Sequence, residues 1–85
     1  METRVAVISI IVEENETVEK LNAVLHDYGQ IIIGRMGIPY RQRGINIISI
    51  AVDGPQDVIA ALAGKIGALP GVSAKTAYSN VVGNV

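Results

Sequence analysis

Two segments rich in β-branched residues set the fold of this 85-residue chain, RVAVISIIV at residues 4–12 and GINIISIAV at residues 44–52. Both have the length of an ordinary strand and lack the polar stripe of a surface helix, so both are predicted to be strands. Polar and apolar residues do not alternate along them as they do in a sheet with one wet face. We therefore expect both faces of these two strands to be covered.

Apolar residues recur at helical spacing after each of these strands: Val18, Leu21, Leu25 and Tyr28 after the first, and Val58, Ile59, Leu62, Ile66 and Leu69 after the second. One apolar stripe of this kind predicts an amphipathic helix. Asn15 is the expected N-cap of the first helix, and Gly29 is its expected left-handed C-terminal cap. Pro55 is expected at or near the first position of the second helix, which Pro70-Gly71 ends.

Two further strands are predicted, at residues 30–37 and 72–79. Pro39 marks the end of the earlier one because proline cannot donate to a central ladder, and residues 38–43 are expected to form a loop. The resulting order, β-α-β-β-α-β, matches the ferredoxin-like α+β fold. Right-handed crossovers then place both helices on one face of a four-stranded antiparallel sheet.

The composition excludes several classes of protein. The absence of cysteine and the presence of one histidine exclude a disulfide framework and a zinc cluster, and a net charge of −1 argues against nucleic-acid binding by bulk charge. No apolar run reaches the ~18 residues of a membrane span, and the N-terminus lacks a signal-peptide pattern. We expect one cytoplasmic domain over residues 1–85, with residues 80–85 as a flexible tail that frays or swaps.

The predicted sheet has more apolar surface than its helices can cover. Apolar residues make up 49% of the chain and charged residues 18%. Residues 4–12 and 44–52 form the two central strands in the ferredoxin-like order, and either set of alternate residues is mostly aliphatic. The open face would leave roughly 10 kcal/mol or more of burial unmet. We therefore expect a homo-oligomer, a dimer or a tetramer, that buries this face.

No arrangement of residues predicts catalysis. His26 falls beside the apolar stripe of the first helix and is expected to lie at the surface. Ser9 and Ser49 lie in mid-strand, unlike the nucleophile of a Gly-x-Ser-x-Gly turn. The acidic cluster at residues 13–16 lacks the spaced pattern of a calcium loop, so it is expected to begin a solvated helix. We predict a non-enzymatic protein with no metal and no cofactor.

Three arginines, Arg35, Arg41 and Arg43, lie within nine positions around the second and third strands. Planar guanidinium groups suit the recognition of carboxylate or phosphate. They are therefore candidates for an anion site. The alternative is a solvated hairpin that pairs with acidic residues of a neighbouring copy.

Several motifs resemble one known family: GRMGIPY at residues 34–40, RGINIIS at 43–49 and ALAGKIG at 61–67, followed by PGV at 70–72 and KT at 75–76. In this order, over nearly the whole chain, they resemble the iron-only hydrogenase system regulators. The resemblance implies an ACT-like fold, akin to the C-terminal sensing domain of nickel-responsive regulators. It also implies an oligomeric state and a regulatory role.

The chain departs from the nickel-responsive regulators in two respects. Those proteins hold nickel with histidines and a cysteine, so no nickel site is expected in a chain with one histidine and no cysteine. They also carry an N-terminal DNA-binding ribbon-helix-helix segment. Here the first strand begins by Arg4, so direct DNA binding is not expected.

The resemblance also implies where a ligand would bind. ACT domains bind amino acids at the first strand–helix turn, at a subunit interface. The corresponding candidates are Glu14, Asn15, Gly37, Ile38, Pro39 and Tyr40. The carboxylates at residues 13–16 would repel the carboxylate of an amino acid, which argues against the usual ligand.

We predict an oligomeric regulatory domain that senses a small ligand or modulates a protein partner. Two alternatives stay open at this stage. One is a purely structural oligomerisation module. The other is a weak nucleic-acid or anion binder that uses Arg35, Arg41 and Arg43.

Overall fold

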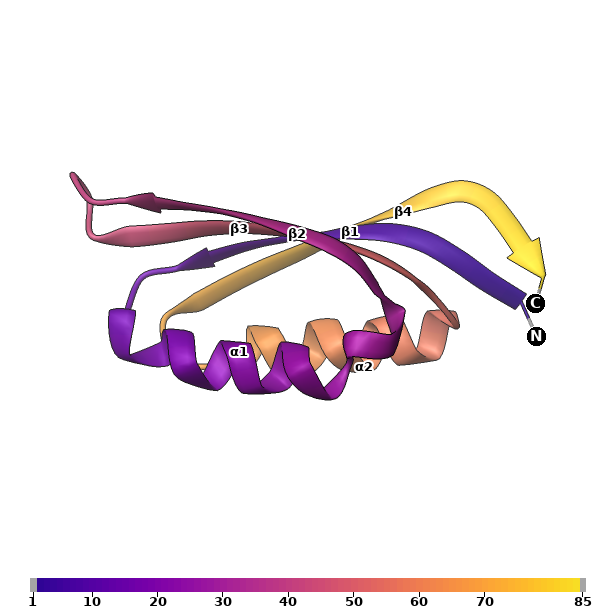
Figure 1. Ribbon diagram of the computed structural model, residues 1–85, viewed down its shortest axis with the longest axis horizontal. Coiled ribbons are helices and arrows are strands. Elements are labelled where there is room, and N and C mark those ends of the chain that lie inside the picture. The colour runs from indigo at the N-terminus through magenta and orange to yellow at the C-terminus, as the bar shows by residue number, and fades with distance from the viewer. Residues whose placement is uncertain (1, 85) are drawn as a thin grey trace.

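The chain folds into two layers, a four-stranded sheet and a pair of helices that cover one of its faces (Figure 1). The computed structural model describes residues 2–84, and the side chains of residues 2–81. The elements in chain order are β1 (Glu2–Val12), the 3-10 turn η1 (Asn15–Thr17), α1 (Val18–Asp27), the 3-10 turn η2 (Gly29–Ile31), β2 (Ile32–Tyr40), β3 (Ile45–Gly54), α2 (Gln56–Gly67) and β4 (Val72–Asn84). The predicted order of strands and helices is confirmed.

The strands β1 and β3 are central in the sheet, as predicted. The sheet order is β2-β3-β1-β4, and each neighbouring pair is antiparallel. The register sets Ile8 opposite Ile50 and Ile10 opposite Ile48. With both helices on one face, this is the ferredoxin-like, ACT-like α+β fold that the sequence predicts.

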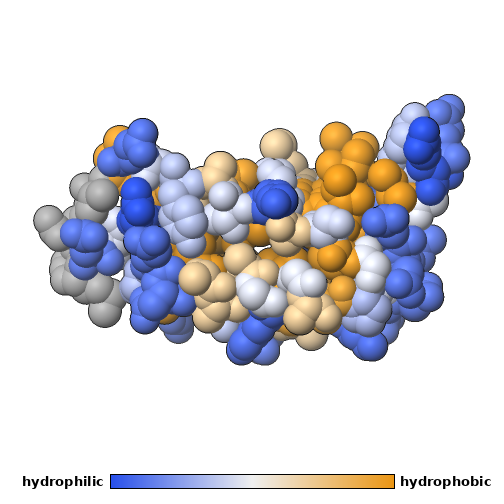
Figure 2. Space-filling model, turned by 180° about the vertical axis from the view of Figure 1, so that it is seen from behind, coloured by the Kyte–Doolittle hydropathy of each residue, from blue (hydrophilic) through white to orange (hydrophobic). Residues whose placement is uncertain are grey.

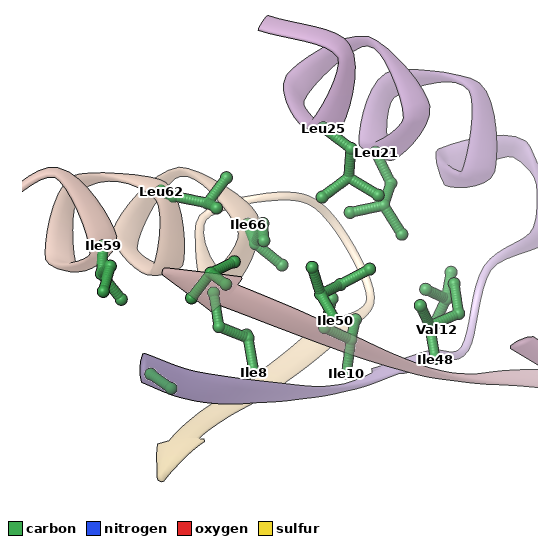
Figure 3. Close-up of a cluster of buried hydrophobic side chains, with 12 residues drawn as sticks. Ile8, Ile10, Val12, Leu21, Leu25, Ile48, Ile50, Ile59, Leu62 and Ile66 are labelled. Atoms are coloured by element: carbon green, nitrogen blue, oxygen red, sulfur yellow. The ribbon is translucent and has the colours of Figure 1, made fainter. Parts of the chain in front are cut away.

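The helix-covered face of the sheet holds the hydrophobic core (Figure 3). Alternate residues of β1 and β3 point toward the apolar stripes of α1 and α2, which confirms the first predicted stripe and, except for Val58, the second. The buried cluster consists of Ala6, Ile8, Ile10, Val12, Leu21, Leu25, Ile48, Ile50, Val52, Ile59, Leu62 and Ile66. Because full burial of one large aliphatic side chain contributes about 1.5–3 kcal/mol, this layer is the main source of folding free energy.

The first helix begins and ends differently from the prediction. Asn15 is not its N-cap, because the turn η1 precedes the helix and the Asn15 amide oxygen instead accepts a hydrogen bond from Asn46 Nδ2 at 3.2 Å. The turn forms because Thr17 is buried and donates its hydroxyl to the carbonyl oxygen of Pro70 at 2.9 Å. Gly29 does not adopt the predicted left-handed conformation. Its φ is not positive, and it begins the turn η2 that follows α1.

The β2–β3 hairpin is longer and tighter than predicted. β2 continues through Pro39 to Tyr40, so the expected loop over residues 38–43 shrinks to a short turn. Proline is tolerated there because β2 is an edge strand, in which half of the N–H groups have no partner strand. Gly44, at a φ of 66°, closes the turn and donates its N–H to the carbonyl oxygen of Arg41 at 3.2 Å.

The C-terminal segment is a strand rather than the predicted tail. β4 continues to Asn84 and pairs with the start of β1, where Glu2 lies opposite Asn84. β1 begins two residues earlier than predicted, and its first residues, 2–4, pair with residues 82–84 of β4. The flexible tail predicted for residues 80–85 is therefore replaced by a paired strand as far as Asn84, while Val85 lies outside the described residues.

Candidate functional site

The face of the sheet opposite the helices is open and mostly apolar. The register places large hydrophobic side chains on it from three strands: Val5, Val7 and Ile11 of β1, Met36, Ile38 and Tyr40 of β2, and Ile47 of β3. Their exposed fractions range from 38% for Val7 to 72% for Met36. Figure 2 shows hydrophobic residues gathered on the sheet side of the molecule, next to the hydrophilic tip at one end. We call this surface the open face.

Small residues make the centre of the open face hollow. One row across the four strands reads Met36, Ser49, Ser9 and Lys75, and the next row reads Ile38, Ile47, Ile11 and Ser73. Between them lies a depression of about 250 Å³, the open-face hollow, lined by Ser9, Ile11, Ile47, Ser49, Ser73 and Lys75 together with backbone of the intervening residues. A second depression of about 410 Å³ is lined by Val7, Gly34, Arg35, Met36, Ser49 and Ala51. The open face therefore combines protruding aliphatic side chains with hollows.

Three polar residues to which the sequence analysis assigns no function meet in the open-face hollow. Ser9 and Ser49 lie directly opposite each other in the β1–β3 register, and Lys75 of β4 lies opposite Ser9 on the other side. The hydroxyls and the ammonium group are donors beside the aliphatic walls of Ile11 and Ile47. Sequence reasoning missed Lys75, although it is the only lysine inside a predicted strand.

The six candidate ligand residues do not share one surface within a single copy. Asn15 reaches the β2–β3 hairpin through its hydrogen bond to Asn46, whose register partner is Pro39. Glu14 is turned the other way and packs over Gly71, where an added Cβ would meet its carboxylate. Of the hairpin residues, Ile38 and Tyr40 lie on the open face, whereas Gly37 and Pro39 lie on the helix side. A ligand site that joins these residues between subunits stays a prediction.

The three candidate arginines are also separated. Arg35 lies on the helix side of β2 and donates from Nη1 to Asn22 Oδ1 at 3.2 Å. It borders a groove of about 290 Å³ with Asn22, Leu25, His26, Gly29 and Ile32. Arg41 and Arg43 lie in the hairpin turn, about 20 Å away along the strand from Arg35. One copy therefore offers at most a pair of arginines at the hairpin tip, and anion binding there stays a prediction.

One lysine on the helix layer has a shifted pKa. A hydrogen bond to the Tyr28 side chain raises the pKa of Lys65, the charge of Tyr28 raises it further, and Asp27 adds a smaller effect. The Lys65 ammonium lies 5.1 Å from the centre of the Tyr28 ring. This contact ties the end of α1 to α2, on the side of the molecule away from the open face.

The described residues also bear on metal binding and on membrane insertion. Within residues 2–84, no group of three or more histidine, aspartate or glutamate side chains lies close enough together to hold a metal ion. None of the helices in that range is both long and apolar enough to cross a membrane.

Comparison with known proteins gives a family and a fold. The family model described as TM1266-like, iron-only hydrogenase system regulator, matches residues 4–76. The solved structure of the uncharacterized protein TM1266 from Thermotoga maritima has a TM-score of 0.85 and 31% sequence identity, covering 89% of this chain and 96% of that chain. A formyltetrahydrofolate deformylase from Pseudomonas putida has a TM-score of 0.66 and 16% identity, covering 91% of this chain and 29% of that chain, and this likeness concerns the fold alone. None of the curated proteins matches the chain.

Proposed function

Because the chain belongs to the TM1266-like family of iron-only hydrogenase system regulators, we propose that it is a non-enzymatic regulatory module that works as a homo-oligomer. In this proposal two copies stack their open faces against each other. The assembled module then responds to a small ligand or acts on a protein partner. The open face is the observation that carries the proposal.

The amount of exposed apolar surface supports the assembly. Seven large hydrophobic side chains lie on the open face, each with 38% or more of its surface exposed. Burying what remains exposed would contribute about 5–10 kcal/mol. That is as large as the net stability of a whole small domain, so a single copy would keep an unusually costly surface in water.

The shape of the open face favours a second copy as the occupant. Met36 and Ile38 protrude along β2 at one edge of the sheet, whereas β4 at the other edge carries the small residues Ser73 and Ala77 on either side of Lys75. A two-fold axis that runs along the strands, between two stacked sheets, lays β2 of one copy over β4 of the other. Ile38 of each copy then lies over the small side chain of Ser73 in its partner, next to Lys75.

Few charged groups oppose this stacking. Among the register-paired residues of the described open face, Lys75 and Asp53 are the charged ones. Asp53 lies opposite Val5, toward one end of the sheet. The patch therefore matches a copy of itself in hydropathy as well as in shape.

Light scattering on the full chain across a range of concentrations tests the assembly. We expect a stable dimer or tetramer, which Ile38→Glu on the open face breaks into monomers. Ile33→Glu is the matched control, since Ile33 is exposed to 63% against 61% for Ile38 but lies at the irregularity of β2, outside the paired rows of the open face. Circular dichroism checks that both variants fold. A wild-type chain that stays monomeric at high concentration contradicts the proposal.

A screen of amino acids, other organic acids and nucleotides by thermal shift tests the regulatory part. Binding of any of them to the assembled chain supports ligand sensing. A silent screen would leave action on a protein partner as the regulatory route.

A further inference from the structure

Within the paired rows of the described open face, no carboxylate lies near Lys75. Its register partner is Ser9, and the other residues that line the open-face hollow are serines, isoleucines and an alanine. The nearest carboxylate in the paired rows, Asp53, lies opposite Val5, four residues along β1 from Ser9. That separation is about 13 Å along the strand, which is too far for an ion pair.

Stacking a second copy on the open face makes this lone charge costly. A solvated lysine needs no partner, but an ammonium group removed from water must be paired and hydrogen-bonded. In the stacking described above, the axis runs along the strands, so Asp53 of the second copy keeps its place along the sheet and stays far from Lys75. No carboxylate of the paired rows of either copy then reaches Lys75, so a bound anion is the fitting source of the pairing charge.

The hollow itself describes the chemistry of such a molecule. Lys75 supplies a positive charge, Ser9, Ser49 and Ser73 supply hydroxyls, and Ile11 and Ile47 supply apolar walls. Small-molecule sites usually combine mostly apolar walls with a few polar groups that fix the orientation. A volume of about 250 Å³ suits a molecule smaller than a typical drug.

We propose that the open-face hollow binds a short aliphatic carboxylate, with the carboxylate on Lys75 and the serine hydroxyls and the alkyl chain between Ile11 and Ile47. This inference rests on the proposed function, because the second copy encloses the ligand. It makes the ligand part of the interface, so that binding and assembly strengthen each other. The module would thereby report the level of an organic acid through its oligomeric state.

Titration calorimetry on the full chain tests the site with hexanoate as the probe and hexanamide as its neutral counterpart. We expect hexanoate to bind more tightly than hexanamide, and Lys75→Gln to weaken hexanoate binding about tenfold or more, since a charge-assisted hydrogen bond is lost. Lys20→Gln is the matched control, because it makes the same change on the exposed surface of α1. It should bind hexanoate like the wild type.

Light scattering on the same samples separates failure of the site from failure of the assembly. A stable oligomer that does not bind hexanoate, or that binds it equally with Lys75→Gln, overturns the carboxylate site and leaves the assembly standing. An oligomer that Asp53→Asn dissociates would show that Asp53 of the second copy is the counter-ion, which also overturns the site. A monomer overturns the proposed assembly and the enclosed site together.

Discussion

The two faces of β1 carry similar side chains and meet very different surroundings. Toward the helices, Ile8, Ile10 and their neighbours are almost completely buried. Away from the helices, Val5, Val7 and Ile11 keep about two fifths of their surface exposed. The difference shows that hydropathy along a strand does not select the core face. The helices select it, because right-handed crossovers bring both of them to the same side.

The largest difference in stability is expected between two single variants of β3, each of which removes one isoleucine from a different face of the sheet. Ile50→Ala leaves a cavity in the core and should lower the free energy of unfolding by about 2–5 kcal/mol, independent of protein concentration. Ile47→Ala on the open face should cost much less within one copy, but its effect should depend on protein concentration because it acts on assembly. Urea unfolding at several concentrations measures both. Equal, concentration-independent losses would remove the contrast between the faces.

Substitution of one glycine on each face of the sheet tests the same difference between the helix-covered face and the open face. An added Cβ at Gly54, on the helix side, would come 2.8 Å from Ile31 Cγ2, whereas Gly34, on the open face, has nothing within 4 Å. Gly54→Ala should therefore destabilise the chain by about 1–3 kcal/mol through overpacking. Gly34→Ala should be close to neutral for one copy. Thermal unfolding of both variants would contradict this reading if Gly34→Ala were the more damaging change.

Removing a hydroxyl group should change the stability by an amount that differs less between the two faces of the sheet. Thr17 is buried on the helix side and donates to the Pro70 carbonyl, so Thr17→Val should cost about 1–2 kcal/mol by leaving that carbonyl without its partner. Ser49→Ala on the open face should change the stability of one copy by less than about 0.5 kcal/mol. Chemical unfolding at low protein concentration checks the pair. A larger loss for Ser49→Ala would mean that its hydroxyl supports the fold itself.

The smallest effect concerns the helix layer, outside both faces of the sheet. Tyr28 raises the pKa of Lys65, so Tyr28→Phe should lower that pKa toward its ordinary value of 10.5. A pKa that is raised in the folded state stabilises the protein below the unfolded pKa, and this contribution disappears as the pH rises through the folded pKa. Around neutral pH the contact should therefore add no pH dependence. NMR titration of the Lys65 side chain tests the shift, and an unchanged pKa in Tyr28→Phe would contradict it.

Much of the fold could be predicted from local patterns. The β-branched segments of β1 and β3 and the stripes of α1 and α2 are local signals, so they were found correctly. The predictions were wrong where a residue distant in the sequence determines the local structure. Asn15 bonds to Asn46 instead of capping α1, and Pro39 stays in β2 because that strand is at the sheet edge.

The candidate site was less predictable for the same reason. The candidate ligand residues Glu14 and Asn15 are adjacent in sequence, yet Glu14 packs on Gly71 and Asn15 bonds to the hairpin. Arg35 points to the helix side, away from the arginines of the turn. Lys75 gains its importance only from its register with Ser9, which no local pattern encodes.

The sequence alone was sufficient for the order of the elements, the central place of β1 and β3, and the excess of apolar surface, because these follow from periodicity and composition. The tertiary structure alone showed which alternate residues face the helices and that the open face has a hollow with a lysine in it. Both depend on strand register, and a shift of one residue would exchange the two faces without changing a single local preference.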